Sequence, residues 1–352
     1  MAKVNAFIQQ TQTLLLLATA FLLVACTDTV DKAQSTAKLS GETMGTFWQV
    51  TLAHELDDNA GQALQTRIEA ALEAINAGMS TYREDSELMR FNRSSETTVQ
   101  AISPELRRVV AKALEISAQS DGAYDVTVGP LVNVWGFGPK RRADKPAEAE
   151  IAAALALVGY DKLQLDDAGL AKSEAGVFVD LSSIAKGYGV DAVGEAIAAA
   201  GYQHFLVEIG GEVRAWGDKY GKPWRVGIER PQSGARGAVQ NVIAMEAALP
   251  AMATSGNYRN YIEHQGEVAY HIIDPKSGHS RASSLLSATV LAADCMTADG
   301  YATALMVLGD DKAMAFADAH GLAAELIFAG EGKGEFVVKR SRAFVDNVKE
   351  SQ

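Results

Sequence analysis

The feature that most constrains the fold is a series of strand-like runs in the second half of the chain that no helix separates. Between residues 205 and 291, short apolar or alternating runs follow one another, most of them bounded by Gly, Pro or Asp. Parallel strands need a long crossover between each pair, so this spacing favours antiparallel pairing. The sequence therefore predicts an α+β fold with mainly antiparallel sheets flanked by helices. The expected strands are 205–209, 224–228, 268–273, 288–291, 325–328 and 336–338.

Helices are predicted where apolar residues recur every three or four positions. Leu64, Ile68 and Leu72 follow this spacing. Ser103 precedes Pro104 in the way that a helix cap precedes a first helical residue. The expected helices cover 64–75, 104–113, 187–200 (ended by Gly201) and 302–308 (ended by Gly309), with a surface helix at 147–156 that starts at Pro146 and a short one at 313–319.

Composition and charge exclude several classes of protein. The 352 residues are 48% apolar and 22% charged, which is typical of a globular protein. The net charge of −12 argues against nucleic acid as a partner, because phosphate binding needs a basic surface. Cys26 and Cys295 are too few for a disulfide framework, and Cys295 is expected to be a small, buried, apolar residue.

The first 26 residues are interpreted as an export signal rather than as part of the fold. After Lys3, residues 14–25 form a run that is almost entirely apolar, whereas a membrane-spanning helix needs about 20 such residues. The run ends in Leu-Val-Ala-Cys, which resembles a bacterial lipobox with Cys26 as the acylated residue; an ordinary secretory signal is the alternative. We expect a protein of the bacterial cell envelope, anchored to a membrane by lipid, with its folded domain in the periplasm. The expected segments are a signal peptide at 1–25, a tether at 26–40, a folded domain at 41–340 and a polar tail at 341–352.

Motifs for the commonest nucleotide and metal sites are absent from the sequence. It has no GxGxxG after a strand and no GxxxxGK[ST], and it lacks HExxH, GxSxG and CxxC. A bound nucleotide would therefore use neither of the two commonest phosphate cradles.

Polar, glycine-rich clusters instead indicate a site with oxygen ligands for a metal ion and a phosphate. Asp299 and Thr303 are four residues apart and share a helix face, and a carboxylate with a hydroxyl suits Mg²⁺. Lys186 lies at a helix start, where free N–H groups attract anions. Each of these residues also has an ordinary structural interpretation, so the residues alone do not identify a reaction. The candidates to pack against a flat ring are Met44, Tyr82 and Tyr124.

The order of these clusters resembles the ApbE family of FAD:protein FMN transferases. The resemblance covers about residues 40 to 330, nearly the whole chain after the export signal. The matching segments are Met-Gly-Thr at 44–46, Ser-x-Tyr at 80–82, Gly-x-Tyr-Asp-x-Thr-Val-Gly-Pro-Leu at 122–131, Trp-Gly-Phe-Gly at 135–138, Ile-Ala-Lys-Gly-Tyr at 184–188, Gly-Gly-Glu at 210–212, Thr-Ser-Gly at 254–256, His-Ile-Ile-Asp-Pro-Lys-x-Gly at 271–278 and Ala-Asp-x-x-x-Thr at 298–303.

The resemblance implies an activity, a cofactor and partners. Members of the family bind FAD with Mg²⁺, cleave its pyrophosphate and link FMN to a Thr or Ser hydroxyl of a target protein, releasing AMP. Targets carry a D-x-x-[ST]-[GA]-[ST]-type sequence, as in subunits of Nqr and Rnf electron-transport complexes. By position, the family's metal ligands match the carbonyl of Ser183 and the side chains of Asp299 and Thr303. The positions that match FAD contacts are Met44, Tyr82, Ala123, Tyr124, Asp125, Asp180, Lys186 and Ile273.

Three catalytic roles follow as hypotheses. Lys186 would stabilise charge on the phosphates, and His271 would take the proton of the acceptor hydroxyl, with Asp299 as the rival base. His271 could instead only order the Asp-Pro turn that follows it. Two other functions stay open: an FAD pyrophosphatase that gives FMN and AMP, and a non-catalytic flavin-binding lipoprotein.

Overall fold

The computed structural model describes residues 35–139, 141–142, 144–231, 238–257, 261–264, 267–280, 283–332 and 334–350. Cys26, the signal peptide predicted at 1–25 and most of the predicted tether lie outside the described residues. Residues Thr36–Gln352 belong to one compact unit. No helix within the described ranges is both long and apolar enough to cross a membrane.

The centre of the fold is an eight-stranded sheet in which every neighbouring pair of strands is antiparallel. This confirms the α+β fold predicted from the sequence. Its strands, in spatial order, are β1 (Ala37–Thr43), β2 (Thr46–Leu52), β5 (Phe205–Ile209), β6 (Glu212–Trp216), β9 (Ala251–Gly256), β12 (Leu285–Ala292), β13 (Ala323–Ala329) and β14 (Phe336–Arg340).

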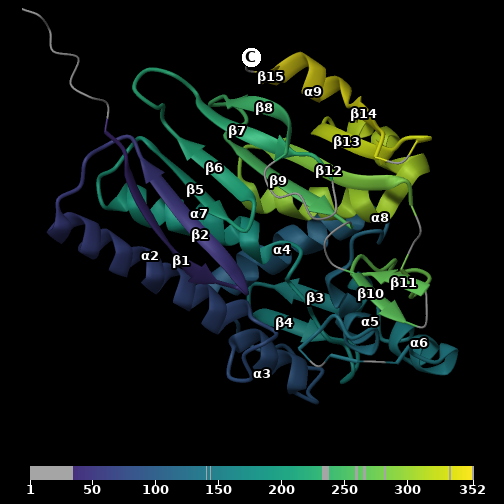
Figure 1. The fold of residues 1–352 in the computed structure, drawn as a ribbon. Coiled ribbons are helices and arrows are strands. Elements are labelled where there is room, and N and C mark those ends of the chain that lie inside the picture. Colours follow the sequence, from purple (N-terminus) through teal and green to yellow (C-terminus); the bar gives the residue numbers. More distant parts are fainter. Residues whose placement is uncertain are drawn as a thin grey trace, which may run out of the picture. The chain divides into compact units, whose positions relative to one another are not determined.

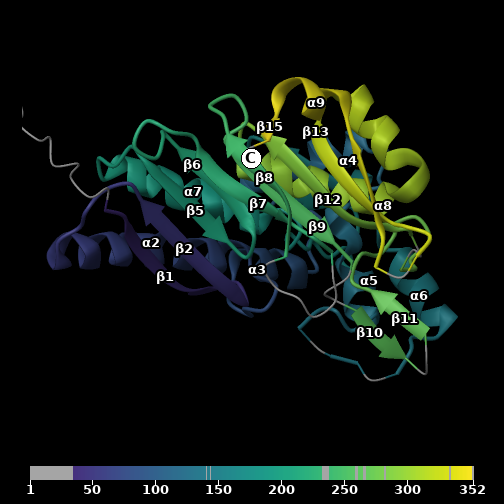
Figure 2. The same ribbon diagram turned by 45° about the horizontal axis from the view of Figure 1, so that its top comes forward.

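Helices cover one face of this sheet (Figures 1 and 2). The helix α7 (Ala185–Ala199) packs on β5 and β6, and α8 (Cys295–Ala319) packs on β9 and β12. Outside them, α2 (Asp58–Met79) lies against α7, and α4 (Pro104–Gln119) lies against α8. Apolar side chains from these four helices and from the sheet form the largest buried clusters, so α7 and α8 are held firmly side by side.

A second, three-stranded sheet packs on the opposite face through a separate apolar cluster. It consists of β7 (Trp224–Glu229), β8 (Val239–Met245) and β15 (Lys349–Glu350), and the short helix α9 (Arg342–Asn347) lies beside β13. Phe344 of α9 is only 2% exposed and belongs to this cluster. The prediction of a polar tail at 341–352 is therefore wrong for residues 341–350, which complete the fold.

The smaller elements gather beyond one end of the large sheet (Figures 1 and 2). Two hairpins lie there, β3–β4 and β10–β11, each of them antiparallel. The bounds are α3 (Glu87–Arg93), α5 (Gly129–Val134), α6 (Glu148–Leu155), β3 (Leu163–Asp166), β4 (Gly169–Lys172), β10 (Tyr261–His264) and β11 (Glu267–Tyr270), with single 3₁₀ turns at Val126–Val128 and Tyr160–Lys162.

Local sequence signals explain where several elements begin and end. The Ser103 hydroxyl accepts a hydrogen bond from the Leu106 amide at 3.2 Å, and Pro104 opens α4, as predicted. The helical dihedral angles end at Gly309, with φ of 68°, as predicted, and α8 resumes beyond this kink and runs to Ala319. The segments predicted on either side of Gly309 are thus two parts of one kinked helix.

Several predicted boundaries differ from the structure, and three of these differences bear on the description of the fold. Ala37–Ser40, assigned to the tether, belongs to the edge strand β1. The strand predicted at 268–273 ends at Tyr270, because the following residues turn towards Asp274 and Pro275 and only Ile273 forms an isolated bridge, with Ser280. The helix predicted at 147–156 begins after Pro146 at Glu148, and it is not purely a surface helix because Ile151 and Ala154 are buried.

A buried lysine ties the hairpin β3–β4 to α3. Lys172 is 1% exposed, and its ammonium donates to the carbonyls of Phe91 and Asn92, each at 3.0 Å, and to that of Val177 at 3.4 Å. Replacing Lys172 with methionine would remove this donor from all three carbonyls, of which that of Phe91 would keep the Ser94 amide at 3.2 Å. We expect Lys172→Met to lower the free energy of unfolding by about 3 kcal/mol, as measured by urea denaturation.

The control for this variant is Lys339→Met. Lys339 is exposed and lies over the ring of Phe328 at 4.8 Å, as Lys172 lies over the ring of Phe91 at 5.1 Å. Its loss is expected to change stability by less than about 1 kcal/mol. Equal losses from the two variants would contradict the role given to the three carbonyl contacts of Lys172.

Candidate active site

The candidate site lies where the amino-terminal ends of α7 and α8 approach each other. Gly187, in the first turn of α7, makes this approach possible because it has no side chain. A Cβ atom on Gly187 would lie 2.3 Å from the Cys295 carbonyl oxygen and 2.8 Å from the Asp299 Cβ. The Gly187 amide donates to Oδ2 of Asp299 at 2.9 Å, so Asp299 is fixed at the start of α7. Two helix amino-terminal ends therefore bring partial positive charge to one place.

Asp191 of α7 holds the start of α8. This carboxylate is fully buried and accepts the amides of Cys295 at 3.0 Å and Met296 at 2.9 Å, as well as the Arg214 guanidinium at 2.6 Å. Cys295 is also fully buried, as predicted, and burial raises the pKa of its thiol well above the usual range. The position of α8 relative to α7, and with it the geometry of the site, thus depends on the buried hydrogen bonds of Asp191.

Lys186 lies between two buried carboxylates. Its ammonium nitrogen is 2.7 Å from Oε1 of Glu212 and 3.6 Å from Oδ1 of Asp299. Burial alone would lower the pKa of Lys186, but the charges of Asp299 and Glu212 outweigh burial and raise it, so the ammonium stays protonated. Burial raises the pKa of both Asp299 and Glu212, and the Lys186 ammonium opposes this shift in each.

The oxygen atoms around Asp299 fit a hard cation such as Mg²⁺. Asp299 and Glu212 are only 2% and 3% exposed, and Oε2 of Glu212 is a buried oxygen without a hydrogen-bond donor. Two carboxylates and one ammonium leave a negative charge in the site that a cation would balance. No group of three or more His, Cys, Asp or Glu side chains among the described residues is arranged to hold a metal, so a cation here would take its other ligands from hydroxyls, carbonyls and substrate.

Thr303 and Ser183 extend this oxygen-rich region. Thr303 follows Asp299 by one turn of α8, and its hydroxyl lies 3.0 Å from that of Ser255 on β9. Ser183, just before α7, donates its hydroxyl to the phenol oxygen of Tyr124 at 2.9 Å. Tyr124 is 2% exposed, and burial raises the pKa of its phenol, which stays protonated. The Ser183 side chain is therefore occupied by Tyr124, which leaves its carbonyl as the candidate ligand.

The segments around Tyr124 and Asp180 lie together, and the carboxylates of Asp125 and Asp180 accept hydrogen bonds from amides of their own loops. Asp125 accepts from the amide and hydroxyl of Thr127, at 2.8 and 2.6 Å, and from the Tyr160 amide at 2.7 Å. The Asp180 amide donates to the Val126 carbonyl at 2.7 Å, joining the two segments. Ala123 is buried beside them. These contacts shape the wall of the site.

A second group of predicted residues gathers around Phe137. Tyr82 is 65% exposed and donates its hydroxyl to the Phe137 carbonyl at 3.3 Å. The ring of His271 lies edge-on to that of Phe137, with centroids 6.4 Å apart. Tyr82 and His271 thus come from distant parts of the chain to one aromatic surface that a flat ring could contact.

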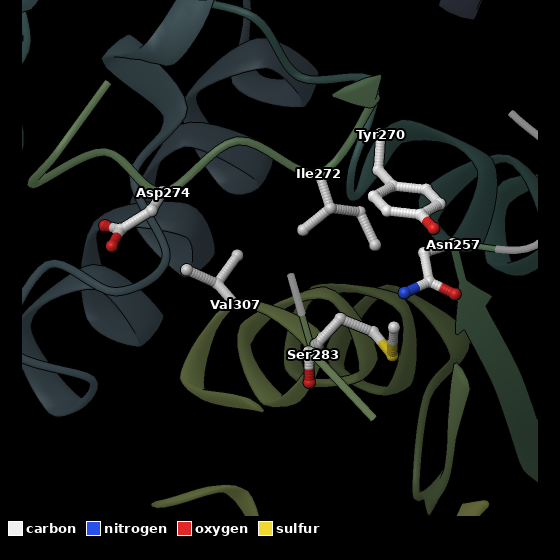
Figure 3. A pocket seen from close by; sticks show the side chains of 7 residues that line it. Asn257, Tyr270, Ile272, Asp274, Ser283 and Val307 are labelled. Atoms are coloured by element: carbon white, nitrogen blue, oxygen red, sulfur yellow. The ribbon is translucent and has the colours of Figure 1, made fainter. Parts of the chain in front are cut away.

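The remaining predicted residues lie at the edges of the site. Met44 occupies the turn between β1 and β2 with a positive φ of 49°, and its methyl group would lie 3.2 Å from a Cβ on Gly189 of α7. Ile273 is buried after β11. Figure 3 shows a small pocket between this segment and α8, with Ile272 facing Val307. Its lining residues are Asn257, Tyr270, Ile272, Asp274, Ser283, Met306 and Val307.

Two residues of the site were not predicted as site residues. Glu212 and Ser255 lie within the Gly-Gly-Glu and Thr-Ser-Gly segments of the sequence, but no role was assigned to either. The sequence signal that could have found Glu212 is an acidic residue directly after two glycines that begins a strand, a position where an ordinary strand would carry an apolar residue.

Comparison with known proteins places these residues in a family. The model of the ApbE family matches residues 44–327. The chain is 45% identical over 338 residues to the FAD:protein FMN transferase of Haemophilus influenzae, covering 93% of this chain and 94% of the relative. It is 43% identical over 309 residues to the protein of the same name from Vibrio cholerae, covering 87% and 90% of the two chains.

Solved structures agree with this family. The flavin transferase ApbE from Vibrio cholerae superposes with a TM-score of 0.79 at 40% identity, covering 89% of this chain and 99% of that one. The ApbE protein of Thermotoga maritima superposes with a TM-score of 0.76 at 28% identity, covering 88% and 98% of the two chains. The antiparallel sheets and flanking helices are therefore shared across the family.

Proposed function

Because the chain belongs to the ApbE family and is an enzyme of the FAD:protein FMN transferase class, we propose that it moves FMN from FAD to a Thr or Ser hydroxyl of a target protein, with Mg²⁺ bound and AMP released. The acceptor would carry a D-x-x-[ST]-[GA]-[ST]-type sequence, as in electron-transport subunits of the Nqr or Rnf kind. The observation that carries this proposal is the cluster of Lys186, Glu212 and Asp299 at the start of α7.

Asp299 and Lys186 of this cluster, with two neighbouring oxygen ligands, each have a task in this reaction. The Asp299 carboxylate, the Thr303 hydroxyl and the Ser183 carbonyl would hold Mg²⁺. When bound, the ion neutralises pyrophosphate charge and polarises the phosphorus that is attacked. The Lys186 ammonium binds phosphate oxygens and stabilises the charge that develops on them. The FAD contacts proposed for Met44, Tyr82, Ala123, Tyr124, Asp125, Asp180 and Ile273 would place the rest of the substrate along the walls described above.

The bond changes follow those of other phosphoryl-type transfers. The acceptor hydroxyl oxygen attacks the FMN-side phosphorus, the bond from that phosphorus to the bridging oxygen breaks, and AMP leaves with that oxygen. His271 is the proposed base that takes the hydroxyl proton. The Asp274 turn is closed by its own main-chain hydrogen bonds, from the Asp274 amide to the His279 carbonyl at 2.9 Å and from the Gly278 amide to the Asp274 carbonyl at 2.8 Å. This supports a task for His271 other than ordering the turn.

Replacing His271 with alanine tests the base. We expect His271→Ala to lower the transfer rate at saturating FAD by about 100-fold, because general base catalysis contributes that much or more. The rate would be measured from the fluorescence of flavin attached to the acceptor. A transfer rate near that of the wild type would contradict the role of His271 as base and leave Asp299 as the candidate.

The products of a defined reaction test the proposed function. The full chain would be incubated with FAD, Mg²⁺ and an acceptor domain, and nucleotides would be separated by chromatography. We expect one AMP for each acceptor modified, and no AMP in the presence of EDTA. AMP formed equally fast without acceptor would indicate a pyrophosphatase, and bound FAD without any AMP would indicate a flavin carrier.

We also propose that Cys26 carries a lipid that anchors the enzyme in the bacterial cell envelope, with the catalytic domain in the periplasm. The fold begins at Ala37, so a short segment would separate the lipid from β1. At most about 3.5 Å per residue, it would keep the catalytic domain within about 40 Å of the membrane. Labelling cells with a fatty-acid analogue tests this proposal, because Cys26→Ala should abolish the label.

A further inference from the structure

The ammonium of Lys186 has two buried carboxylates within reach and is hydrogen-bonded to only one of them. It lies 2.7 Å from Oε1 of Glu212, a hydrogen-bond distance, and 3.6 Å from Oδ1 of Asp299, which is too long for a hydrogen bond. Glu212 is therefore the principal counter-ion of Lys186. Asp299 keeps a longer-range attraction to the same ammonium.

Because Lys186 is hydrogen-bonded to Glu212 and not to Asp299, one oxygen of Asp299 stays accessible to a cation. Oδ2 of Asp299 accepts the Gly187 amide at 2.9 Å, whereas Oδ1 faces the more distant Lys186 ammonium. If the ammonium were hydrogen-bonded to Oδ1, a positive charge would occupy the position that a metal ion needs. A divalent cation would then have to displace Lys186 before it could bind.

Glu212 is held in place by two neighbouring turns. It begins β6 directly after Gly210 and Gly211, and the β5–β6 turn lies against the β1–β2 turn. A Cβ on Gly210 would lie 2.9 Å from the methyl group of Thr46, and the Gly210 amide donates to the Phe47 carbonyl at 3.0 Å. At 3% exposure, the Glu212 side chain is enclosed by protein, and its carboxylate lies beside the Lys186 ammonium.

We propose that Glu212 is a positioning residue that holds the Lys186 ammonium away from Asp299 and so keeps Oδ1 of Asp299 open to the divalent cation. This inference rests on the proposed role of Asp299 as a metal ligand and adds the residue that controls access to that ligand. Without the charge of Glu212, the ammonium moves to the remaining carboxylate. Lys186 and the cation then compete for Asp299.

The variant Glu212→Gln tests this competition, since glutamine has the same shape without the charge. Titration of the purified full chain with Mn²⁺ alone, followed by calorimetry, should give a Kd that is weaker by about tenfold or more, as is usual when a residue that supports a metal ligand is lost. The Mg²⁺ concentration that half-activates transfer should rise by a similar factor. The rate at saturating Mg²⁺ should stay within about threefold of the wild-type rate, because metal binding is weakened and the chemical step is not.

A second substitution separates competition from structural damage. In the double variant E212Q/K186M the competing ammonium is gone, so Mn²⁺ should bind at least as tightly as it binds the wild type. A structural role of Glu212 would not be rescued in this way. The double variant also tests the proposal if E212Q alone folds poorly, because it removes both members of the ion pair together.

The matched control is Glu208→Gln. Glu208 lies on β5, opposite Val213 in the same hairpin, and is half-buried. The Mn²⁺ affinity of the Glu208→Gln variant should equal that of the wild type. Wild-type affinity in E212Q, or weak affinity that persists in E212Q/K186M, would overturn the proposal. Mn²⁺ binding that is absent from the wild type, or unchanged in Asp299→Asn, would instead overturn the metal assignment on which the proposal rests.

Discussion

Replacing Asp299 with asparagine is expected to lower the rate of FMN transfer about 1000-fold while the protein stays folded. A metal ion that stabilises transition-state charge contributes several kcal/mol, and about 4 kcal/mol corresponds to that factor. Asparagine keeps an oxygen for the Gly187 amide but removes the charge that would hold the ion. The rate would be measured from flavin attached to the acceptor at fixed FAD and Mg²⁺.

The same substitution should not destabilise the fold. Burial raises the pKa of Asp299 above its value in the unfolded chain, so the folded protein binds a proton more readily than the unfolded chain does. Stability then falls as the pH rises from the unfolded pKa to the folded pKa, because the unfolded chain releases this proton while the folded protein still holds it. A neutral asparagine has no such dependence, so Asp299→Asn should melt no lower than the metal-free wild type at pH 8.

The control for this variant lies on the same helix. Asp318, near the end of α8, accepts the Arg342 amide at 2.8 Å and takes no part in the site. Asp318→Asn should transfer FMN at the wild-type rate. A wild-type rate in Asp299→Asn would remove Asp299 from the set of metal ligands.

Replacing Gly187 with alanine is the second substitution with a large expected effect. The new methyl group would lie 2.3 Å from the Cys295 carbonyl oxygen, which is backbone and cannot move without shifting α8. Overpacking of this kind destabilises by about 1–3 kcal/mol. The shift would also separate Lys186 from Asp299, and a displacement of about 1 Å can lower a rate about 100-fold. We expect both effects in Gly187→Ala, measured by urea denaturation and by transfer rate.

A glycine in open space provides the control for Gly187. A Cβ atom on Gly78, near the end of α2, would meet no atom within 4 Å beyond its own helix backbone and chain neighbours. Gly78→Ala should keep the wild-type rate and raise stability by up to about 1 kcal/mol, because alanine favours helix more than glycine does. If Gly187→Ala behaved like Gly78→Ala, the close contact of α7 and α8 would not be what positions the site.

Much of the fold was predictable because local patterns agree with the tertiary structure. Phe205–Ile209 alternates between buried and half-buried residues, and its predicted bounds match those of β5. Leu64, Ile68 and Leu72 lie buried on one face of α2, as their spacing predicts. In these elements the spacing of apolar residues in the sequence matches the face that is buried in the structure.

The misjudged ends of the domain have a physical explanation. Strand β1 is an edge strand with alternating exposed and half-buried residues, and its composition is as polar as that of a tether. Helix α9 has a single buried apolar residue, Phe344. Arg340 also holds the end of the chain through ion pairs to Glu325 at 2.9 Å and to Glu350. Strand pairing at a sheet edge, one buried side chain and a few ion pairs hold these segments. Such contacts leave no periodic pattern of apolar residues in the sequence.

The site was predictable only in part for a similar reason. Asp299 and Thr303 share one helix, so their spacing already placed them on one face. Glu212 meets Lys186 and Asp299 only because β6 lies beside α7 and because Gly187 lets two helices approach closely. No spacing along the chain relates the three charged residues. Their convergence is a property of the tertiary structure.

Mass spectrometry of the acceptor protein tests the central claim most directly. The full chain would be incubated with FAD, Mg²⁺ and a domain that carries a D-x-x-T-[GA]-T-type sequence, and the domain's threonine would then be analysed. We predict a mass gain of one FMN on that threonine, and no gain with EDTA or with Asp299→Asn. An unmodified acceptor together with free FMN and AMP, or with intact bound FAD, would contradict the account.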